Sequence, residues 1–409
     1  MSQNGHKPKL TDTICYTKSQ LIYCKMQQLN IKTCIFILRM KHGQISIQFN
    51  WIFILIVGGI ILLFFGSVIK TQTSLSKSKI ATTILNDLDA ISTGAEVSRG
   101  TIQVINIPNL DLGFRCSETC SCTYSLSNIQ VPYGDKILFS PNQIKGSRML
   151  AWTFDWSMPF RVTNLVYMTS PEVKYVLLDT TADDFPDELF DSLPPRIMEI
   201  EESEELIYNK QLQDVNNVDR VEKEGNYKTR FIAFDDSYQF NQGIPTNYLD
   251  VADTAVTALR VRGNKEKGTL TFFKKVDDDW IPESNELPYI GESMLYAAIF
   301  SENKEIYQCG IERIFEKMQY VTDVYRLKND DLIANSNPNC AVLHQGVEDI
   351  LVNDPKNIKG LVTDILNTPL ENNKDNFNNL NDLAFTPSTG LNDKNKALTT
   401  STDGCIEIY

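Results

Sequence analysis

The longest apolar run of the chain lies in its N-terminal quarter. Trp51 to Ile69 contains no charged residue and is mostly Ile, Leu, Val and Phe. In a helix, a run of this length covers about 28 Å, close to the ~30 Å hydrocarbon core of a bilayer. A cleaved secretory signal has a shorter apolar core followed by an Ala-x-Ala-like site, which this run lacks. The pattern therefore predicts a single-pass transmembrane helix.

Helical spacing of apolar residues continues after this run. The residues that recur at this spacing, with polar residues between them, are Ile80, Ile84, Leu85, Leu88 and Ile91. Gly94 is a typical helix stop. We therefore expect one helix over residues 44–93, with its first half in lipid and its second half forming a stalk against an outer domain.

Residues 95–170 have the pattern of short strands. Aromatic and β-branched segments alternate there with Pro, Gly and Asn turn signals. Trp152 and Trp156 lie in this region, and we expect them to be buried aromatic residues of a compact sheet. The pattern predicts a small β-rich domain next to the stalk.

The period changes in residues 171–369, where strands and helices alternate. The nearly continuous apolar run at 173–181 is typical of a strand buried on both faces, and residues 229–236 are expected to form another strand. We also expect a helix at 183–194, a hairpin of 256–263 with 268–275, a strand at 294–301 and an amphipathic helix at 307–327. Strand–helix–strand order predicts a layered α/β domain, partly parallel, so the whole chain belongs to the α+β class.

Residues 370–409 are polar and rich in Asn, which is typical of loops. The chain ends in the alternation CIEIY, from Cys405 to Tyr409, which favours a last edge strand. We therefore expect a polar tail that a terminal strand and its disulfide hold in place.

Charge divides the chain at the apolar run. Residues 1–70 hold eight of the 39 Lys and Arg residues and one of the 52 Asp and Glu residues, so 31 basic and 51 acidic residues remain in 71–409. Basic flanks stay in the cytoplasm, which places the N-terminus inside and residues 71–409 outside the cell membrane. Because an acidic part of this size repels phosphate backbones, we expect no nucleic-acid partner.

The segment KHGQISIQF at 41–49 combines basic residues, Gly43 and Gln44 directly before the apolar run. It resembles the archaeal type IV pilin-like signal, also called a class III signal peptide. The resemblance implies that a prepilin-type peptidase cuts between Gly43 and Gln44 in the cytoplasm and that the apolar helix stays on the mature protein. Assembling pilins usually carry Glu where this chain has Gln48, so the resemblance implies processing more than filament assembly. The alternative is an uncleaved signal anchor.

The leader of this family is short, whereas residues 1–43 would form a long basic leader or cytoplasmic tail. A start at Met40 would give the leader MKHG instead. We therefore expect residues 1–39 to be either an over-extended reading-frame start or a cytoplasmic tail.

Nine cysteines split into three before the apolar run and six after it. The six outer cysteines are Cys116, Cys120, Cys122, Cys309, Cys340 and Cys405. An even outer number favours disulfides on an oxidising side of the membrane. Cys116 paired with Cys120 or with Cys122 would close a local loop. The alternative is that Cys116, Cys120 and Cys122 are thiolate ligands of zinc or an iron–sulfur cluster.

Acidic residues cluster where the predicted strands end. Asp179, Asp183 and Asp235 would lie at the carboxyl edge of a parallel sheet, where ligands bind and carboxylates can hold Mg²⁺. Helix capping, by Asp183 or Asp184, and a solvated acidic rim are the alternative. The sequence has no phosphate-binding loop and no G-x-S-x-G or H-E-x-x-H motif, and we expect no cofactor. His344 lies between apolar residues and is expected to be structural.

These patterns favour a single-pass, membrane-anchored protein of the outer surface without catalysis. Its role would be that of a pilin-like, envelope or adhesion component. Its partners would be the lipid bilayer, a prepilin-type peptidase and other envelope proteins. The alternative is a membrane-anchored extracytoplasmic hydrolase or a metal-dependent ligand-binding domain that uses Asp179, Asp183 and Asp235.

Overall fold

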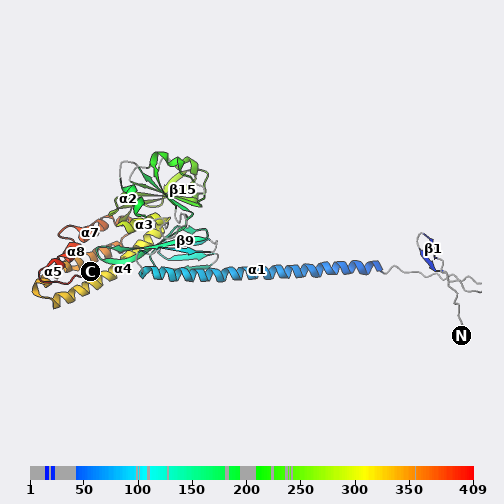
Figure 1. The fold of residues 1–409 in the computed structure, drawn as a ribbon, viewed down its shortest axis with the longest axis horizontal. Helices are drawn as coiled ribbons and strands as arrows, with labels where there is room; N and C mark the ends of the chain where they lie inside the picture. The colour runs from blue at the N-terminus through cyan, green and yellow to red at the C-terminus, as the bar shows by residue number, and fades with distance from the viewer. Residues whose placement is uncertain are drawn as a thin grey trace, which may run out of the picture. The chain divides into compact units, whose positions relative to one another are not determined.

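The computed structural model of the chain has two compact units, Met1–Leu75 and Ser76–Tyr409 (Figure 1). The boundary falls within α1 (Gly43–Val97), one continuous helix that covers the predicted range 44–93. Side chains of α1 are described at 54–67, 70, 79 and 81–94. The structure describes residues 14–17, 20–23, 43–97, 100, 102–107, 111–126, 129–179, 184–193, 209–222, 225–234, 238, 240, 243–354 and 356–409.

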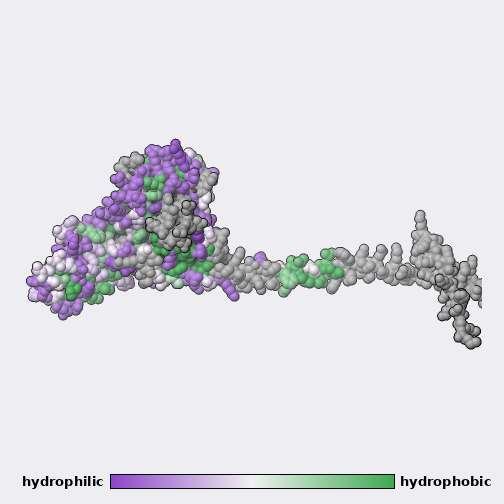
Figure 2. Space-filling view, in the orientation of Figure 1, coloured by the Kyte–Doolittle hydropathy of each residue, from purple (hydrophilic) through white to green (hydrophobic). Residues whose placement is uncertain are grey.

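The first unit contains the hairpin of β1 (Ile14–Thr17) and β2 (Gln20–Tyr23) and the first part of α1. The large apolar side chains of α1 at 54–56 and 60–65 are exposed by 48% to 76%. Figure 2 shows a hydrophobic band along this helix. Among the residues whose side chains the structure describes, no helix is long and apolar enough to cross a membrane. The transmembrane helix at 51–69 and the cleavage after Gly43 stay predictions.

In the second unit, the last part of α1 packs against the β-rich region. Ala81, Leu85 and Leu88 are buried on one side of the helix. They share a hydrophobic cluster with Phe114 and Tyr124 of a small sheet. The helix after residue 76 therefore has one apolar face that is covered by protein, as the stalk pattern predicts.

The β-rich region contains two four-stranded sheets. The small antiparallel sheet has the order β6-β5-β4-β8 and the other has the order β3-β9-β10-β7. Trp152 and Trp156 of β9 are buried, as expected. The strands are β3 (Ile102–Asn106), β4 (Leu112–Cys116), β5 (Cys122–Leu126), β6 (Ile129–Pro132), β7 (Leu138–Phe139), β8 (Gln143–Ile144), β9 (Arg148–Ser157) and β10 (Arg161–Thr169).

A seven-stranded sheet follows, in the order β12-β11-β13-β14-β15-β16, with β17 paired to β15. Its first four strands in this order are parallel and the rest are antiparallel. The prediction of a partly parallel sheet is therefore confirmed, as is the hairpin of β14 and β15. The strands are β11 (Val173–Asp179), β12 (Asn209–Asp214), β13 (Lys228–Phe234), β14 (Val256–Gly263), β15 (Lys267–Val276), β16 (Asp279–Pro282) and β17 (Leu287–Ile290).

Some helices contact this sheet, and others build the C-terminal region, where α5, α7 and α8 gather together (Figure 1). The α-helices are α2 (Phe185–Ser192), α3 (Glu292–Phe300), α4 (Lys304–Asn335), α5 (Pro338–Glu348), α6 (Ile358–Asn367), α7 (Lys374–Phe385) and α8 (Leu391–Thr400). The short helices are η2 (Val215–Arg220), η4 (Thr246–Tyr248), η5 (Asp253–Ala255), η6 (Asp349–Asn353) and η7 (Leu370–Asn372).

Three predictions are wrong. The segment 294–301 was expected as a strand and forms most of α3 instead. Every residue from 294 to 300 is buried, so neither a helical nor a strand period is visible in its sequence. The polar tail at 370–409 contains α7 and α8 rather than loops. The predicted terminal strand is also absent, since residues 404–409 have no regular secondary structure. The backbone N–H of Ile408 donates to the side-chain oxygen of Asn395 at 2.8 Å.

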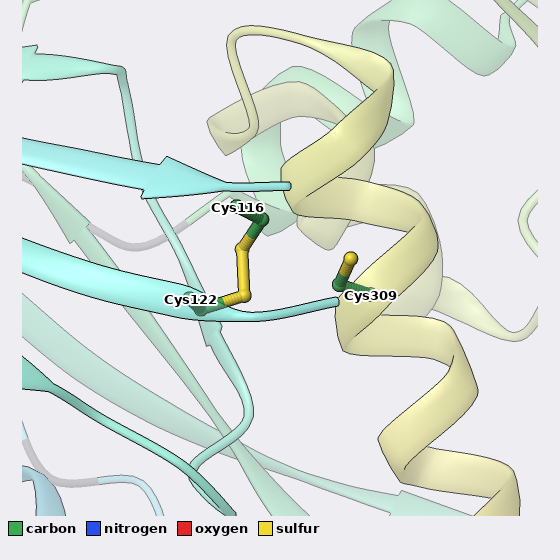
Figure 3. Close-up of side chains that lie close together, drawn as sticks. All are labelled: Cys116, Cys122 and Cys309. Carbon is green, nitrogen blue, oxygen red and sulfur yellow. A yellow bond between two sulfur atoms is a disulfide. The ribbon is translucent and has the colours of Figure 1, made fainter. Parts of the chain in front are cut away.

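Three disulfides use all six outer cysteines. The predicted disulfides are confirmed, and Cys116 pairs with Cys122 rather than Cys120. Cys309 lies on α4, so its disulfide connects the small sheet to a helix 189 residues later in the chain. Figure 3 shows Cys309 beside the Cys116–Cys122 bond. The pairs are Cys116–Cys122, Cys120–Cys309 and Cys340–Cys405.

The two neighbouring disulfides should differ in their contribution to stability. The Cys120–Cys309 pair spans 189 residues and the Cys116–Cys122 pair spans six. Since a longer closed loop removes more entropy from the unfolded chain, removal should cost about 5 kcal/mol for the first and about 2 kcal/mol for the second. We expect C120S/C309S to lower the denaturation midpoint in guanidinium chloride more than C116S/C122S does. An equal or reversed order would contradict this expectation.

Candidate functional site

A polar cavity of about 970 Å³ lies between the small sheet and the amino ends of the parallel strands. This volume is at the upper end of the range of small-molecule sites, about 300–1,000 Å³. Its walls come from β4, β5, β8, the start of β13, η5 and the connection from α3 to α4. Segments far apart in the sequence therefore meet at one cavity, which we call the polar pocket.

The strands β4 and β5 provide one wall of the polar pocket. Leu112 and Phe114 of β4 are buried in the core, so Gly113 and Arg115 lie on the opposite face and line the pocket. Gly113 pairs with Ser125 of β5 across the antiparallel ladder. A Cβ atom at Gly113 would meet the Ser125 hydroxyl, so the absence of a side chain at Gly113 leaves room for this hydroxyl.

A buried ion pair forms another part of the pocket lining. Lys228 begins β13 and Glu302 follows α3, and their side chains are only 6% and 8% exposed. Glu302 Oε2 accepts from the Lys228 ammonium and, at 2.7 Å, from the backbone N–H of Asn142. Burial lowers the pKa of Lys228, although the charge of Glu302 acts in the opposite direction. One carboxylate thus joins three separate segments.

A second buried cation, Arg230, reinforces this junction. Its guanidinium donates to the backbone oxygens of Ala298 and Glu302 at 3.0 and 3.1 Å and to the Thr257 hydroxyl at 3.0 Å. Burial lowers the pKa of Arg230 to about 10, so it stays charged at neutral pH. Arg230 therefore adds a second buried positive charge next to Glu302.

Lys145 and Tyr227 form the rim of the pocket. The Tyr227 hydroxyl donates to the Gln143 carbonyl at 3.0 Å and accepts from the Lys145 backbone N–H at 3.2 Å. The Lys145 ammonium lies 5.6 Å from the centre of the Tyr227 ring, which is within the range of a cation–π contact. Neither Lys145 nor Arg115 has a carboxylate partner within the described part of the chain.

The three predicted acidic residues are only partly placed. Asp179 ends β11, is half-buried and stands in register with Asp214 at the end of β12. Asp183 and Asp235 lie outside the described residues. Asp184 occupies the N-cap position of α2, but its side chain makes no capping hydrogen bond. The Mg²⁺ site stays a prediction.

The cysteine cluster settles the choice between thiolates and disulfides within this structure. The sulfur atoms of Cys116, Cys122 and Cys309 lie within 4.8 Å of one another (Figure 3). Among the described residues, this is the one group whose spacing suits a metal ion. Each of these sulfurs is bonded to another sulfur, and a metal would need thiolates.

His344 has the structural surroundings that its sequence context predicts. It is fully buried on α5, and its Nδ1 lies 2.9 Å from the side-chain oxygen of Asn329 on α4. Asn329 also donates to Glu348 at 2.9 Å. Burial lowers the pKa of His344 below its usual value. These contacts connect α4 to α5.

Sequence reasoning did not single out Arg115, Lys145, Lys228 or Glu302. A signal was present in KTRFIAF, where Lys228 and Arg230 alternate within a strand that is buried throughout. Buried charges need partners, so this strand required an acidic group from elsewhere in the fold. Comparison with protein-family models, curated proteins and solved structures found no match for this chain.

Breaking the buried ion pair should destabilise the fold strongly. K228M leaves the Glu302 carboxylate buried with one hydrogen-bond donor, which should cost about 3–5 kcal/mol of unfolding free energy. The exposed pair of Lys265 and Glu188 supplies the control, since solvent screens it and K265M should leave stability almost unchanged. Urea denaturation followed by tryptophan fluorescence measures both. A similar effect of the two variants would contradict the buried role of Lys228.

Proposed function

We propose that this chain is a single-pass membrane protein whose second unit lies outside the cell, where it serves as a non-catalytic, pilin-like envelope or adhesion component. The observation that carries the proposal is the change of surroundings along α1. Large apolar side chains are exposed at 54–56 and 60–65, whereas Leu85 and Leu88 are buried against protein.

Exposure of this kind needs an apolar partner. Successive helix residues are rotated by about 100°, so the consecutive exposed residues from 60 to 65 point in all directions around the helix. A helix that is hydrophobic all round is stable inside a bilayer or a large protein core. The uncharged sequence from Trp51 to Ile69 and the basic residues before it support a bilayer, with the N-terminus in the cytoplasm.

The disulfides support the placement of the second unit. They persist on oxidising sides of membranes and are rare in reducing cytoplasm. All three lie after residue 76, in the part that follows the apolar run. An extracytoplasmic position agrees with this distribution and with the acidic charge of residues 71–409.

The alternative of a metal-dependent hydrolase has weaker support. Asp179 is the one residue of its proposed triad within the described part of the chain. Among the described residues, the group whose spacing suits a metal ion consists of three cysteines and does not include Asp179. The anchored, non-catalytic role is therefore the function that we propose.

Charge placed in the apolar run should abolish anchoring. Lysine at the centre of a membrane helix costs about 2.5–3.5 kcal/mol per residue, so I61K/L62K should move the protein from the membrane fraction to the alkaline carbonate supernatant. I61L/L62I keeps the apolar character and should stay in the pellet. Protease added to intact cells should digest the second unit of the wild type. Extraction of the wild type by carbonate would contradict the anchor.

Cleavage of the leader is tested separately. When the chain is coexpressed with a prepilin-type peptidase, N-terminal sequencing should find Gln44 as the first residue. G43V should block this processing, whereas S46A, which lies on the other side of the bond, should leave it intact. An unprocessed wild-type N-terminus would favour an uncleaved signal anchor and leave the membrane location unaffected.

A further inference from the structure

The charge of the polar pocket is opposite to that of the unit around it. Residues 71–409 carry 51 acidic and 31 basic residues. The pocket, in contrast, is lined by three cations, Arg115, Lys145 and Lys228, and by two acids, Asp111 and Glu302. Because Glu302 is engaged by Lys228, the remaining charge of the lining is positive. Such a pocket attracts an anion and concentrates it against the field of the surrounding surface.

The two outer cations are free to bind a ligand. Arg115 is exposed on β4, and the Lys145 ammonium lies 5.6 Å from the centre of the Tyr227 ring. Neither has a carboxylate partner among the described residues. Arginine presents a planar fork of donors that matches a carboxylate, and a nearby lysine adds a point charge. Both cations line the pocket, and each can bind a carboxylate group.

The rest of the lining suits hydroxyl groups. The side chains of Ser125, Gln143 and Thr254 line the pocket and have no hydrogen-bond partner within the described part of the chain. Lys228 has three N–H donors, of which the Glu302 carboxylate accepts one. The lining thus offers both donors and acceptors, and the hydroxyl groups of a polyhydroxylated ring can pair with both.

Apolar ligands are disfavoured by the same lining. Apart from Tyr227, its apolar contributions are the small residues Gly113, Ala252 and Ala255. Lys145 lies over the Tyr227 ring. A volume of about 970 Å³ accommodates a sugar ring together with neighbouring units of a chain.

We propose that the polar pocket binds a hydroxylated carboxylate, namely a uronic acid sugar, with Arg115 or Lys145 binding the carboxylate and the other polar side chains of the lining binding the ring hydroxyls. The binding is non-covalent and needs no metal ion. It goes beyond the anchored role proposed above and does not depend on it, since it concerns the second unit alone.

Isothermal titration of the full chain in detergent with glucuronate tests the proposal. Glucose lacks the carboxylate and acetate lacks the hydroxyls, and both should bind at least tenfold more weakly than glucuronate. Inorganic phosphate should also bind at least tenfold more weakly. Oligogalacturonate separates the two sources of the ligand, because tighter binding than galacturonate indicates a glycan chain and equal binding indicates a free sugar acid.

Paired variants locate the binding site. R115Q/K145Q should weaken glucuronate binding at least tenfold, and G113V, whose side chain would displace the Ser125 hydroxyl, should weaken it without a change of charge. R220Q/K394Q removes the same charges outside the pocket and should leave binding unchanged. Absence of glucuronate binding to the folded wild type would overturn the proposal. Unchanged binding in R115Q/K145Q, or phosphate binding as tight as that of glucuronate, would also overturn it.

Discussion

The buried ion pair between Lys228 and Glu302 is the constraint on which the second unit depends. Removing two charges from water is expensive, and their attraction repays that cost only when the geometry holds them together. Glu302 contacts the first residue of β13 and the backbone of Asn142, so the large sheet, the α3–α4 connection and the β-rich region must meet at one point. Arg230 extends the junction to Thr257 on β14.

One disulfide connects elements that lie next to this junction. Cys120–Cys309 ties the small sheet to α4, the helix that begins two residues after Glu302. The small sheet also holds the end of α1, through the cluster of Leu85, Leu88 and Tyr124. The elements that line the polar pocket are therefore held together by the Cys120–Cys309 disulfide and by the buried ion pair of Lys228 and Glu302. A binding site needs such rigid support.

Much of the architecture was predictable because local patterns are strong there. The helix at 43–97, the parallel strands around Val173–Asp179 and the hairpin of β14 and β15 follow from apolar period and turn residues. The segment 294–301 was not predictable in this way, since burial on all sides removes the period that distinguishes a helix from a strand. The Asn-rich tail misled the prediction because its helices bury few residues, such as Phe377, Leu380 and Leu398.

The sequence by itself determined the long helix with its apolar run, the buried strand near Val173 and the hairpin of β14 and β15, since each depends on neighbouring residues. Only the tertiary structure decided which cysteines pair and which cations lack partners. Cys120 meets Cys309 across 189 residues, and Lys228 meets Glu302 across 74. No local pattern encodes such distances. The polar pocket exists because the fold brings Arg115, Lys145 and Lys228 to one cavity, although each, taken alone in the sequence, is an ordinary basic residue.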